Sequence, residues 1–189
     1  MKTTSSRLWV MAAGITMLAS CGPQLATTSV PRASTAKVSS SDGSLAGTLH
    51  AQVNSFRTSI GRPALQRHAG LDRMAQQHAE FLRKNRGKFG KSNLTHYGFE
   101  ERALAAQRMM SMSNVGENIA TCSGSGKNSA SVMLNAWKNS SGHAKNMKGD
   151  WSVTGIGAVV DSDGTVFATQ LFATQNHSHN ALTNRMRQF

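Results

Sequence analysis

The chain has 189 residues, of which 21 are Lys or Arg and 9 are Asp or Glu, and its formal net charge is +12. Basic residues are not interleaved with aromatic ones, and the single Tyr and three Trp are scattered along the chain. The sequence therefore lacks a stacking platform for nucleic acid bases, and no nucleic acid partner is expected. It contains two Cys, which excludes a disulfide framework once one of them is modified.

The N-terminal residues have the layout of a secretory signal peptide. Lys2 and Arg7 supply positive charge, residues 8–17 (LWVMAAGITM) form a short apolar run, and the small residues Ala19 and Ser20 follow it. The run is too short to cross the roughly 30 Å apolar core of a bilayer as a stable helix. We therefore expect residues 1–20 to be a signal peptide that is removed on export.

Residues 18–21 (LASC) resemble a lipobox, the cleavage site of bacterial lipoproteins. The resemblance implies cleavage before Cys21 and lipidation of its sulfur atom, with ordinary secretion as the alternative. Gly22 stands where an Asp tends to retain Gram-negative lipoproteins at the inner membrane, so by analogy it permits the outer membrane. We expect an extracytoplasmic, lipid-anchored protein that faces the periplasm or lies in the outer membrane.

The predicted partners follow from this location. The Cys21 lipid would hold the protein at a membrane, because the several chains of a lipoprotein anchor bind durably. Without Lys2 and Arg7 the formal charge falls to +10, which favours a lipid or an anionic envelope polymer as a further partner.

The rest of the chain divides into a tether, one domain and a tail. Residues 21–44 begin with the lipidated Cys, are rich in Ser, Thr and Ala, and are predicted to form a flexible tether that spans on the order of 25 Å. Residues 45–175 are predicted to form a single domain, and residues 176–189 a polar tail. With Cys21 lipidated, Cys122 has no partner within the chain, so it is either a small buried side chain or a free thiol that pairs two chains.

Apolar periodicity predicts the elements of the domain in chain order. Helices are expected over residues 49–60, 71–82 and 100–110, followed by an extended segment over 115–120 and a helix over 128–139. Two strands, over 153–160 and 165–173, are joined by a hairpin turn at residues 161–164 (DSDG). Helices first and then an antiparallel sheet indicate an α+β fold.

Several of these segments resemble motifs of the CAP superfamily, which includes cysteine-rich secretory, antigen five and pathogenesis-related proteins. The most specific segment is residues 116–120 (GENIA), and residues 136–146 (AWKNSSGHAKN) resemble the bacterial, SCP-domain form of a second motif. Residues 54–65 (NSFRTSIGRPAL), residues 155–157 (GIG) and residues 170–172 (QLF) are also similar to family segments. The resemblance implies a three-layer α-β-α sandwich and an extracellular role.

Members of this family often carry a cavity lined by two His and two Glu. Carried over by motif, these positions are His96, Glu117 and His143, while the second Glu falls at Ser140. The resemblance implies His96, His143 and Glu117 as metal ligands, and it implies that the cavity or ligand-binding wall includes Ser140, Trp137 and Asn118.

Two chemical interpretations of these residues remain open. Two imidazoles and a carboxylate meet the three-ligand count of a catalytic Zn²⁺ site, in which Glu117 and His143 would be the catalytic residues. Alternatively, Glu117 and His143 hydrogen-bond each other and tie the extended segment to a helix end, because a buried carboxylate needs a partner.

The expected function is that of an exported, membrane-anchored CAP-domain lipoprotein of the bacterial cell envelope. Its His/Glu cleft would bind a divalent metal, a lipid or a wall component without turnover. One alternative is a metal-dependent hydrolase that uses His96, His143 and Glu117. Another is a surface interaction module that acts through its basic face.

Overall fold

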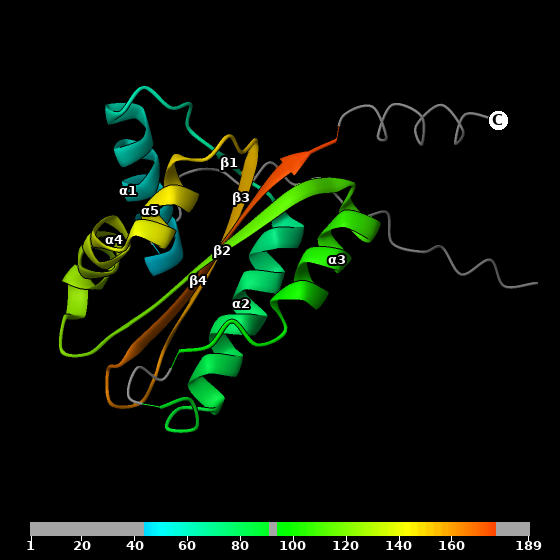
Figure 1. The fold of residues 1–189 in the computed structure, drawn as a ribbon. Coiled ribbons are helices and arrows are strands. Elements are labelled where there is room, and N and C mark those ends of the chain that lie inside the picture. The colour runs from blue at the N-terminus through cyan, green and yellow to red at the C-terminus, as the bar shows by residue number, and fades with distance from the viewer. Residues whose placement is uncertain (1–43, 91–93, 177–189) are drawn as a thin grey trace, which may run out of the picture. The chain divides into compact units, whose positions relative to one another are not determined.

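The computed structural model describes residues 44–90 and 94–176, which form the domain shown in Figure 1. The predicted signal peptide, Cys21, nearly all of the tether and most of the tail lie outside the described residues. The helices are α1 (Leu45–Ser59), α2 (Ala69–Lys84), α3 (Phe99–Met110), α4 (Ser129–Asn139) and α5 (Ser141–Lys148), with a 3-10 turn η1 (Gly126–Asn128) before α4. The strands are β1 (Gln66–Arg67), β2 (Met112–Cys122), β3 (Val153–Val160) and β4 (Val166–Gln175).

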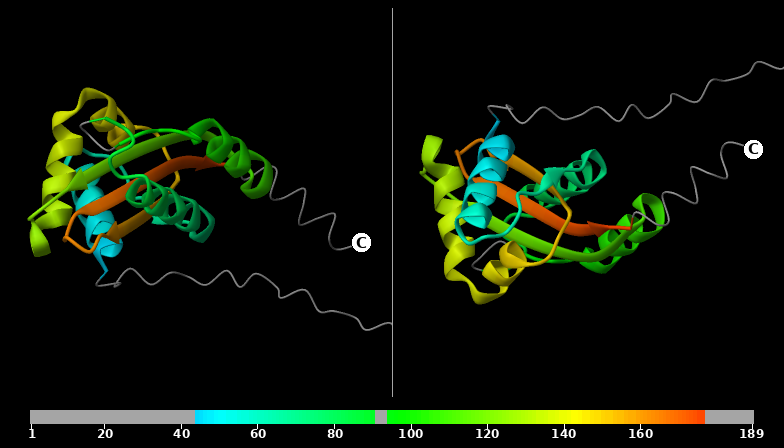
Figure 2. Two further views of the ribbon diagram at one scale, coloured as in Figure 1. Left: turned by 90° about the horizontal axis from the view of Figure 1, so that it is seen from below. Right: turned by 90° about the horizontal axis from the view of Figure 1, so that it is seen from above.

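The four strands form one mixed sheet between two layers of helices. The strand order is β1-β3-β4-β2, with β1 parallel to β3 and the other two pairs antiparallel. Helices α1, α4 and α5 cover one face, and α2 and α3 cover the other (Figures 1 and 2). This arrangement confirms the predicted three-layer α-β-α fold.

Strand β4 is buried on both faces because helices cover both. Its residues from Val166 to Ala173 are all buried, so alternate side chains supply two different cores. Phe172 packs with α1, α4 and α5, whereas Leu171 packs with α2 and α3. Among the described residues, the buried apolar side chains lie between Leu49 and Ala173 and form the hydrophobic core of this domain.

Helix α2 approaches the sheet closely at the outer edge of β3. A Cβ atom on Gly155 would lie 2.2 Å from the backbone carbon of Leu71, and one on Gly157 would lie 2.2 Å from the backbone nitrogen of Gln76. Where β3 continues past its two-residue pairing with β1, side chains of α2 accept hydrogen bonds from its outward N–H groups. Asp72 accepts from Ile156 at 2.9 Å, and Gln76 accepts from Ala158 at 3.0 Å.

The structure differs from the sequence prediction in two places. Strand β1 has only two residues, and its parallel pairing makes the sheet mixed rather than antiparallel. Helix α5 was not predicted, because its eight residues bury only Ala144 and Met147 and show little apolar periodicity. No helix within the described residues is both long and apolar enough to cross a membrane.

Because α2 lies so close to β3, adding a single methyl group at Gly157 should destabilise the domain. Gly157→Ala places that group against the backbone of α2, so we expect the free energy of unfolding in urea to fall by about 3 kcal/mol or more. Gly142→Ala is the matched control, because a Cβ there meets no atom within 4 Å and the position is helical. Equal stability of the two variants would contradict the close packing of α2 on β3.

Candidate functional site

Glu117 is a buried carboxylate at the centre of the candidate site. It lies on β2 opposite Leu171 of β4, and its side chain is 1% exposed. Arg102 of α3 donates to both of its oxygens, from Nε to Oε2 at 2.8 Å and from Nη2 to Oε1 at 2.9 Å. His96 donates from Nδ1 to Oε1 at 2.8 Å. The negative charge is therefore paired and hydrogen-bonded, as burial requires.

The segment before α3 is held in place by the same group of residues. The backbone oxygen of Tyr97 accepts from Nη1 of Arg102 at 3.0 Å. The backbone oxygen of Thr95 accepts from Nε2 of His78 at 3.0 Å, and His78 lies 3.8 Å from Glu117. Burial lowers the pKa of His78, and the charge of Glu117 opposes this effect. His78 thus links α2 to the loop that carries His96.

His143 reaches the same region from the opposite layer, on α5. Its pKa is lowered by burial and then by the charge of His96, so the two imidazoles are electrostatic neighbours. Its backbone oxygen accepts from Nδ2 of Asn118 at 3.2 Å. The structure therefore places His96 in contact with Glu117, and it places the backbone of His143 against the next residue of β2, Asn118. The alternative interpretation was wrong in its partner, because Glu117 hydrogen-bonds His96 rather than His143.

In this structure Glu117 is engaged by protein donors and is not free as a third zinc ligand. In the parts of the chain that the structure describes, no group of three or more His, Cys, Asp or Glu side chains is placed to hold a metal ion. The oxygens of Glu117 already accept hydrogen bonds from Arg102 and His96. The carboxylate therefore orients the imidazole ring of His96 through Nδ1. It has almost no exposed surface with which to bind a metal or activate a water molecule.

The three residues predicted to line the cavity have mainly structural positions. Trp137 is fully buried and donates from Nε1 to the backbone oxygen of Ile119 at 2.9 Å. Asn118 is also fully buried and accepts from Asn146 at 2.9 Å, so neither Trp137 nor Asn118 has surface for a ligand. Ser140 is half-buried and immediately precedes α5. This finding corrects the prediction for Trp137 and Asn118.

These contacts explain why the two most specific motifs occur together. β2 lies at the edge of the sheet, and its outward backbone oxygens need donors. Asn146 donates to the oxygen of Glu117 at 3.0 Å, and Trp137 donates to that of Ile119. Side chains of the second motif thus complete the hydrogen bonding of the first.

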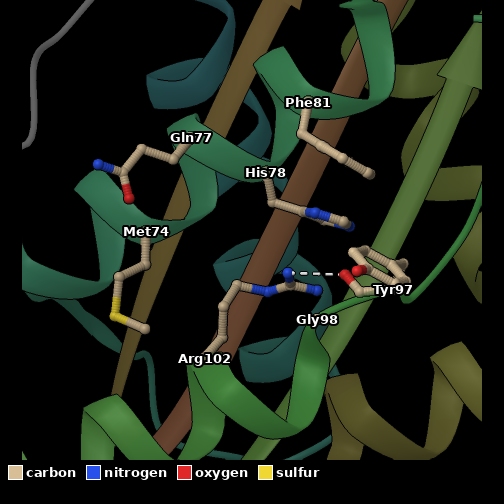
Figure 3. Close-up of a pocket in the computed structure, with 7 residues that line it drawn as sticks. All are labelled: Met74, Gln77, His78, Phe81, Tyr97, Gly98 and Arg102. Carbon is tan, nitrogen blue, oxygen red and sulfur yellow. Dashed lines mark hydrogen bonds between the residues drawn. The ribbon is translucent and has the colours of Figure 1, made fainter. Parts of the chain in front are cut away.

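We call Glu117 and its neighbours Arg102, His96 and His78 the Glu117 cluster. A cavity of about 230 Å³ lies next to this cluster, on the α2 and α3 side of the sheet, and Figure 3 shows the residues that line it. Its wall is mainly aromatic and apolar, and it consists of Met74, Gln77, His78, Phe81, Tyr97, Gly98 and Arg102. The ring of Phe81 stacks on His78 at 5.7 Å and on Tyr97 at 5.8 Å between centroids. Tyr97 is 71% exposed and forms the outer wall.

Most of this cavity could not be predicted from the sequence, because Arg102, Phe81 and Tyr97 belong to none of the recognised motifs. The adjacency of Tyr97 to His96, and the position of Arg102 on a helix following that loop, were the available signals.

Cys122 is a free, half-buried thiol, and its Sγ lies 3.9 Å from the backbone oxygen of Ser129. Cys21 lies outside the described residues, so the structure does not test its lipidation.

The fold is an α-β-α sandwich, with a mixed sheet between two helical layers and a buried Glu at an edge strand. This is the class of protein that the sequence motifs indicate. The model of the cysteine-rich secretory protein family (CAP) matches residues 50–176. The chain therefore belongs to the CAP family.

A solved structure of a bacterial protein agrees with this fold. An outer surface protein from Borrelia burgdorferi is similar with a TM-score of 0.56 and 20% identity, over 68% of this chain and 90% of that one. The structure of BmVAL-1 is similar at a TM-score of 0.46 and 13% identity, over 70% of this chain and 77% of that one. A search of curated proteins found no match in sequence.

The pairing of Glu117 predicts a large cost for removing its guanidinium partner. Arg102→Met leaves the carboxylate buried without its main counter-charge, so we expect the free energy of unfolding to fall by about 3–5 kcal/mol in urea. Adding Glu117→Gln to this variant removes the unpaired charge and should restore part of the loss. Arg108→Met, at an exposed position on the same helix, is the control and should change stability by less than about 0.5 kcal/mol. A similar small loss for Arg102→Met would contradict the ion pair.

Proposed function

We propose that this CAP-domain protein is an exported, lipid-anchored protein of the bacterial cell envelope that binds an apolar ligand group without turnover. The export signal and the lipobox in residues 1–21 support the location. The similar protein from Borrelia burgdorferi is described as an outer surface protein, which agrees with an extracytoplasmic role.

The state of Glu117 is the observation that favours binding over catalysis. A general base must lie within hydrogen-bond reach of the proton that it removes. The oxygens of Glu117 instead accept from Arg102 and His96, and its side chain is 1% exposed. This pairing argues against the hydrolase alternative, which needs the carboxylate of Glu117 as a ligand or water activator.

The cavity beside the cluster supplies the binding site in this proposal. Met74, Phe81 and Tyr97 provide apolar and aromatic surface, and the exposed Gln77 offers an amide at the rim. A volume of about 230 Å³ is smaller than the roughly 300–1,000 Å³ of pockets that enclose whole small molecules. It therefore suits part of a ligand, such as the end of an acyl chain.

The Glu117 cluster has a positioning role in this site. Arg102 contacts both Glu117 and the backbone of Tyr97, so the buried ion pair fixes the outer wall of the cavity. A fixed wall reduces the entropy that a ligand would otherwise lose by ordering it.

The lipid anchor can be tested through Cys21. In the bacterial host the full chain should fractionate with membranes, and Cys21→Ser should release it or leave it as an uncleaved precursor, because the acylated thiol is absent. Mass spectrometry of the mature N-terminus should show a lipidated Cys21. Cys122→Ser is the control and should leave the fractionation unchanged. An unmodified N-terminus in a released wild-type protein would show ordinary secretion instead.

The cavity can be tested with a fluorescent fatty acid, cis-parinaric acid. We expect saturable one-to-one binding to residues 22–189, which include the whole described domain. Tyr97→Ala should weaken binding by roughly tenfold, because it removes one aromatic wall. Leu104→Ala, a partly exposed apolar residue on α3 outside the cavity, is the matched control and should have no effect.

Two results would contradict the proposal. Equal binding by both variants would place the ligand elsewhere. Hydrolysis of p-nitrophenyl butyrate that Glu117→Gln abolishes, in a folded variant, would support the hydrolase instead.

A further inference from the structure

A second surface, separate from the cavity, carries a concentration of unpaired positive charge. Helices α4 and α5, together with Arg62 of the α1–β1 connection, line an open hollow of about 690 Å³. Its lining includes four cations, Arg62, Lys138, Lys145 and Lys148. We call these four residues and the hollow between them the basic hollow.

The sequence makes most of this surface basic. From Asn118 to Gly149 the chain contains no Asp or Glu, although it contains four Lys. Asp150 is the first acidic residue after this stretch, and it pairs with Arg62. Among the described residues, no carboxylate forms an ion pair with Lys138, Lys145 or Lys148. All three lysines are exposed.

The backbone at the end of α5 and the side chain of Lys138 are held in place around the hollow. Arg57 is fully buried and donates from Nη1 to the backbone oxygens of Met147 at 2.6 Å and Gly149 at 3.0 Å, which anchors the end of α5. The ammonium of Lys138 lies 5.5 Å from the ring centroid of Phe56, which holds it over α1. Lys145 and Lys148 are three residues apart and therefore project from neighbouring positions on α5.

We propose that the basic hollow docks the domain onto a membrane surface by binding the phosphate head groups of anionic phospholipids. Three unpaired ammonium groups around a depression complement a phosphate, and the depression is large enough to admit a head group. Each Lys near an anionic membrane surface adds about 1 kcal/mol of attraction. The hollow is lined by no aromatic side chain, so it offers no platform for stacking nucleic acid bases.

The proposed lipid anchor makes this contact geometrically accessible but is not required for it. With Cys21 lipidated, the domain would stay near the bilayer, where a weak electrostatic contact is enough to orient it. The docking therefore goes beyond ligand binding at the cavity, because it concerns the opposite layer of the fold.

The test uses residues 22–189 without a lipid, so that the anchor cannot supply the binding. Co-sedimentation compares vesicles of equal parts phosphatidylglycerol and phosphatidylcholine with vesicles of phosphatidylcholine alone. We expect binding only to the anionic vesicles, weakening as salt shortens the range of electrostatic attraction. Combined Lys138→Gln, Lys145→Gln and Lys148→Gln should reduce it by roughly tenfold to a hundredfold.

The control removes the same charge from elsewhere on the domain. Lys84→Gln, Lys88→Gln and Arg108→Gln alter three exposed cations outside the basic hollow, and this variant should retain most of the binding. An equal loss in both variants would attribute binding to net charge and overturn the proposal. Absence of binding to anionic vesicles, with lysine-dependent binding to soluble dextran sulfate, would assign the hollow to an anionic polymer instead. Neither result would affect the membrane fractionation that depends on Cys21 or the fatty acid titration of the cavity.

Discussion

The buried charge of Glu117 is the constraint on which the candidate site depends. A carboxylate removed from water needs a counter-charge and hydrogen-bond donors, and these must come from segments that pack against β2. Arg102 supplies the charge from α3, and His96 supplies a further donor from the preceding loop. The same guanidinium holds the backbone of Tyr97, so the loop, the helix and the wall of the cavity are positioned together. The acidic residue thus acts mainly as a structural anchor around which the site is arranged.

A second constraint comes from β2 being the edge strand of the sheet. Its outward carbonyl groups would face either solvent or the α4–α5 layer without donors. Asn146 and Trp137 supply donors to two of these groups, and Asn118 is bonded in turn to α5. Arg57 performs a similar task for the end of α5. Many residues that carry the family resemblance therefore satisfy backbone groups, which explains why they predict the fold better than a particular activity.

The parts of the fold that could be predicted from sequence are those with a regular apolar pattern. Each of the helices α1, α2 and α4 buries one face, so its apolar residues repeat at helical spacing. Strands β3 and β4 each have a continuous buried run. Helix α5 buries two residues of eight and has no such repeat. Strand β1 pairs through only two residues, which is too short for any periodicity. Its position depends on where β3 lies, and this is a tertiary property.

The family resemblance implied that His96, Glu117 and His143 belong to one site, and the structure pairs His96 with Glu117. The chemistry of these residues could not be predicted from the sequence. The role of Glu117 depended on a partner that no motif named, because any segment packed against β2 could have supplied the cation. Arg102 lies 15 residues before Glu117, and the contact arises only from the turn between α3 and β2. Trp137 and Asn118 are fully buried and therefore cannot contact a ligand at the surface. The sequence could not show this, because residue type alone does not distinguish a cavity wall from a core.

The position of the basic hollow relative to the cavity follows from the layered fold. The hollow lies on the layer formed by α1, α4 and α5, whereas the cavity lies between α2 and the start of α3 on the other face. Strand β4, which lies between them, is buried on both faces from Val166 to Ala173. Contact of an anionic surface with α4 and α5 would therefore leave the opening beside Tyr97 unobstructed. A sandwich of this kind can use one helical layer for attachment to a membrane and the other for binding a ligand. The two layers are separate because alternate side chains of β4 contribute to a different core on each face of the sheet.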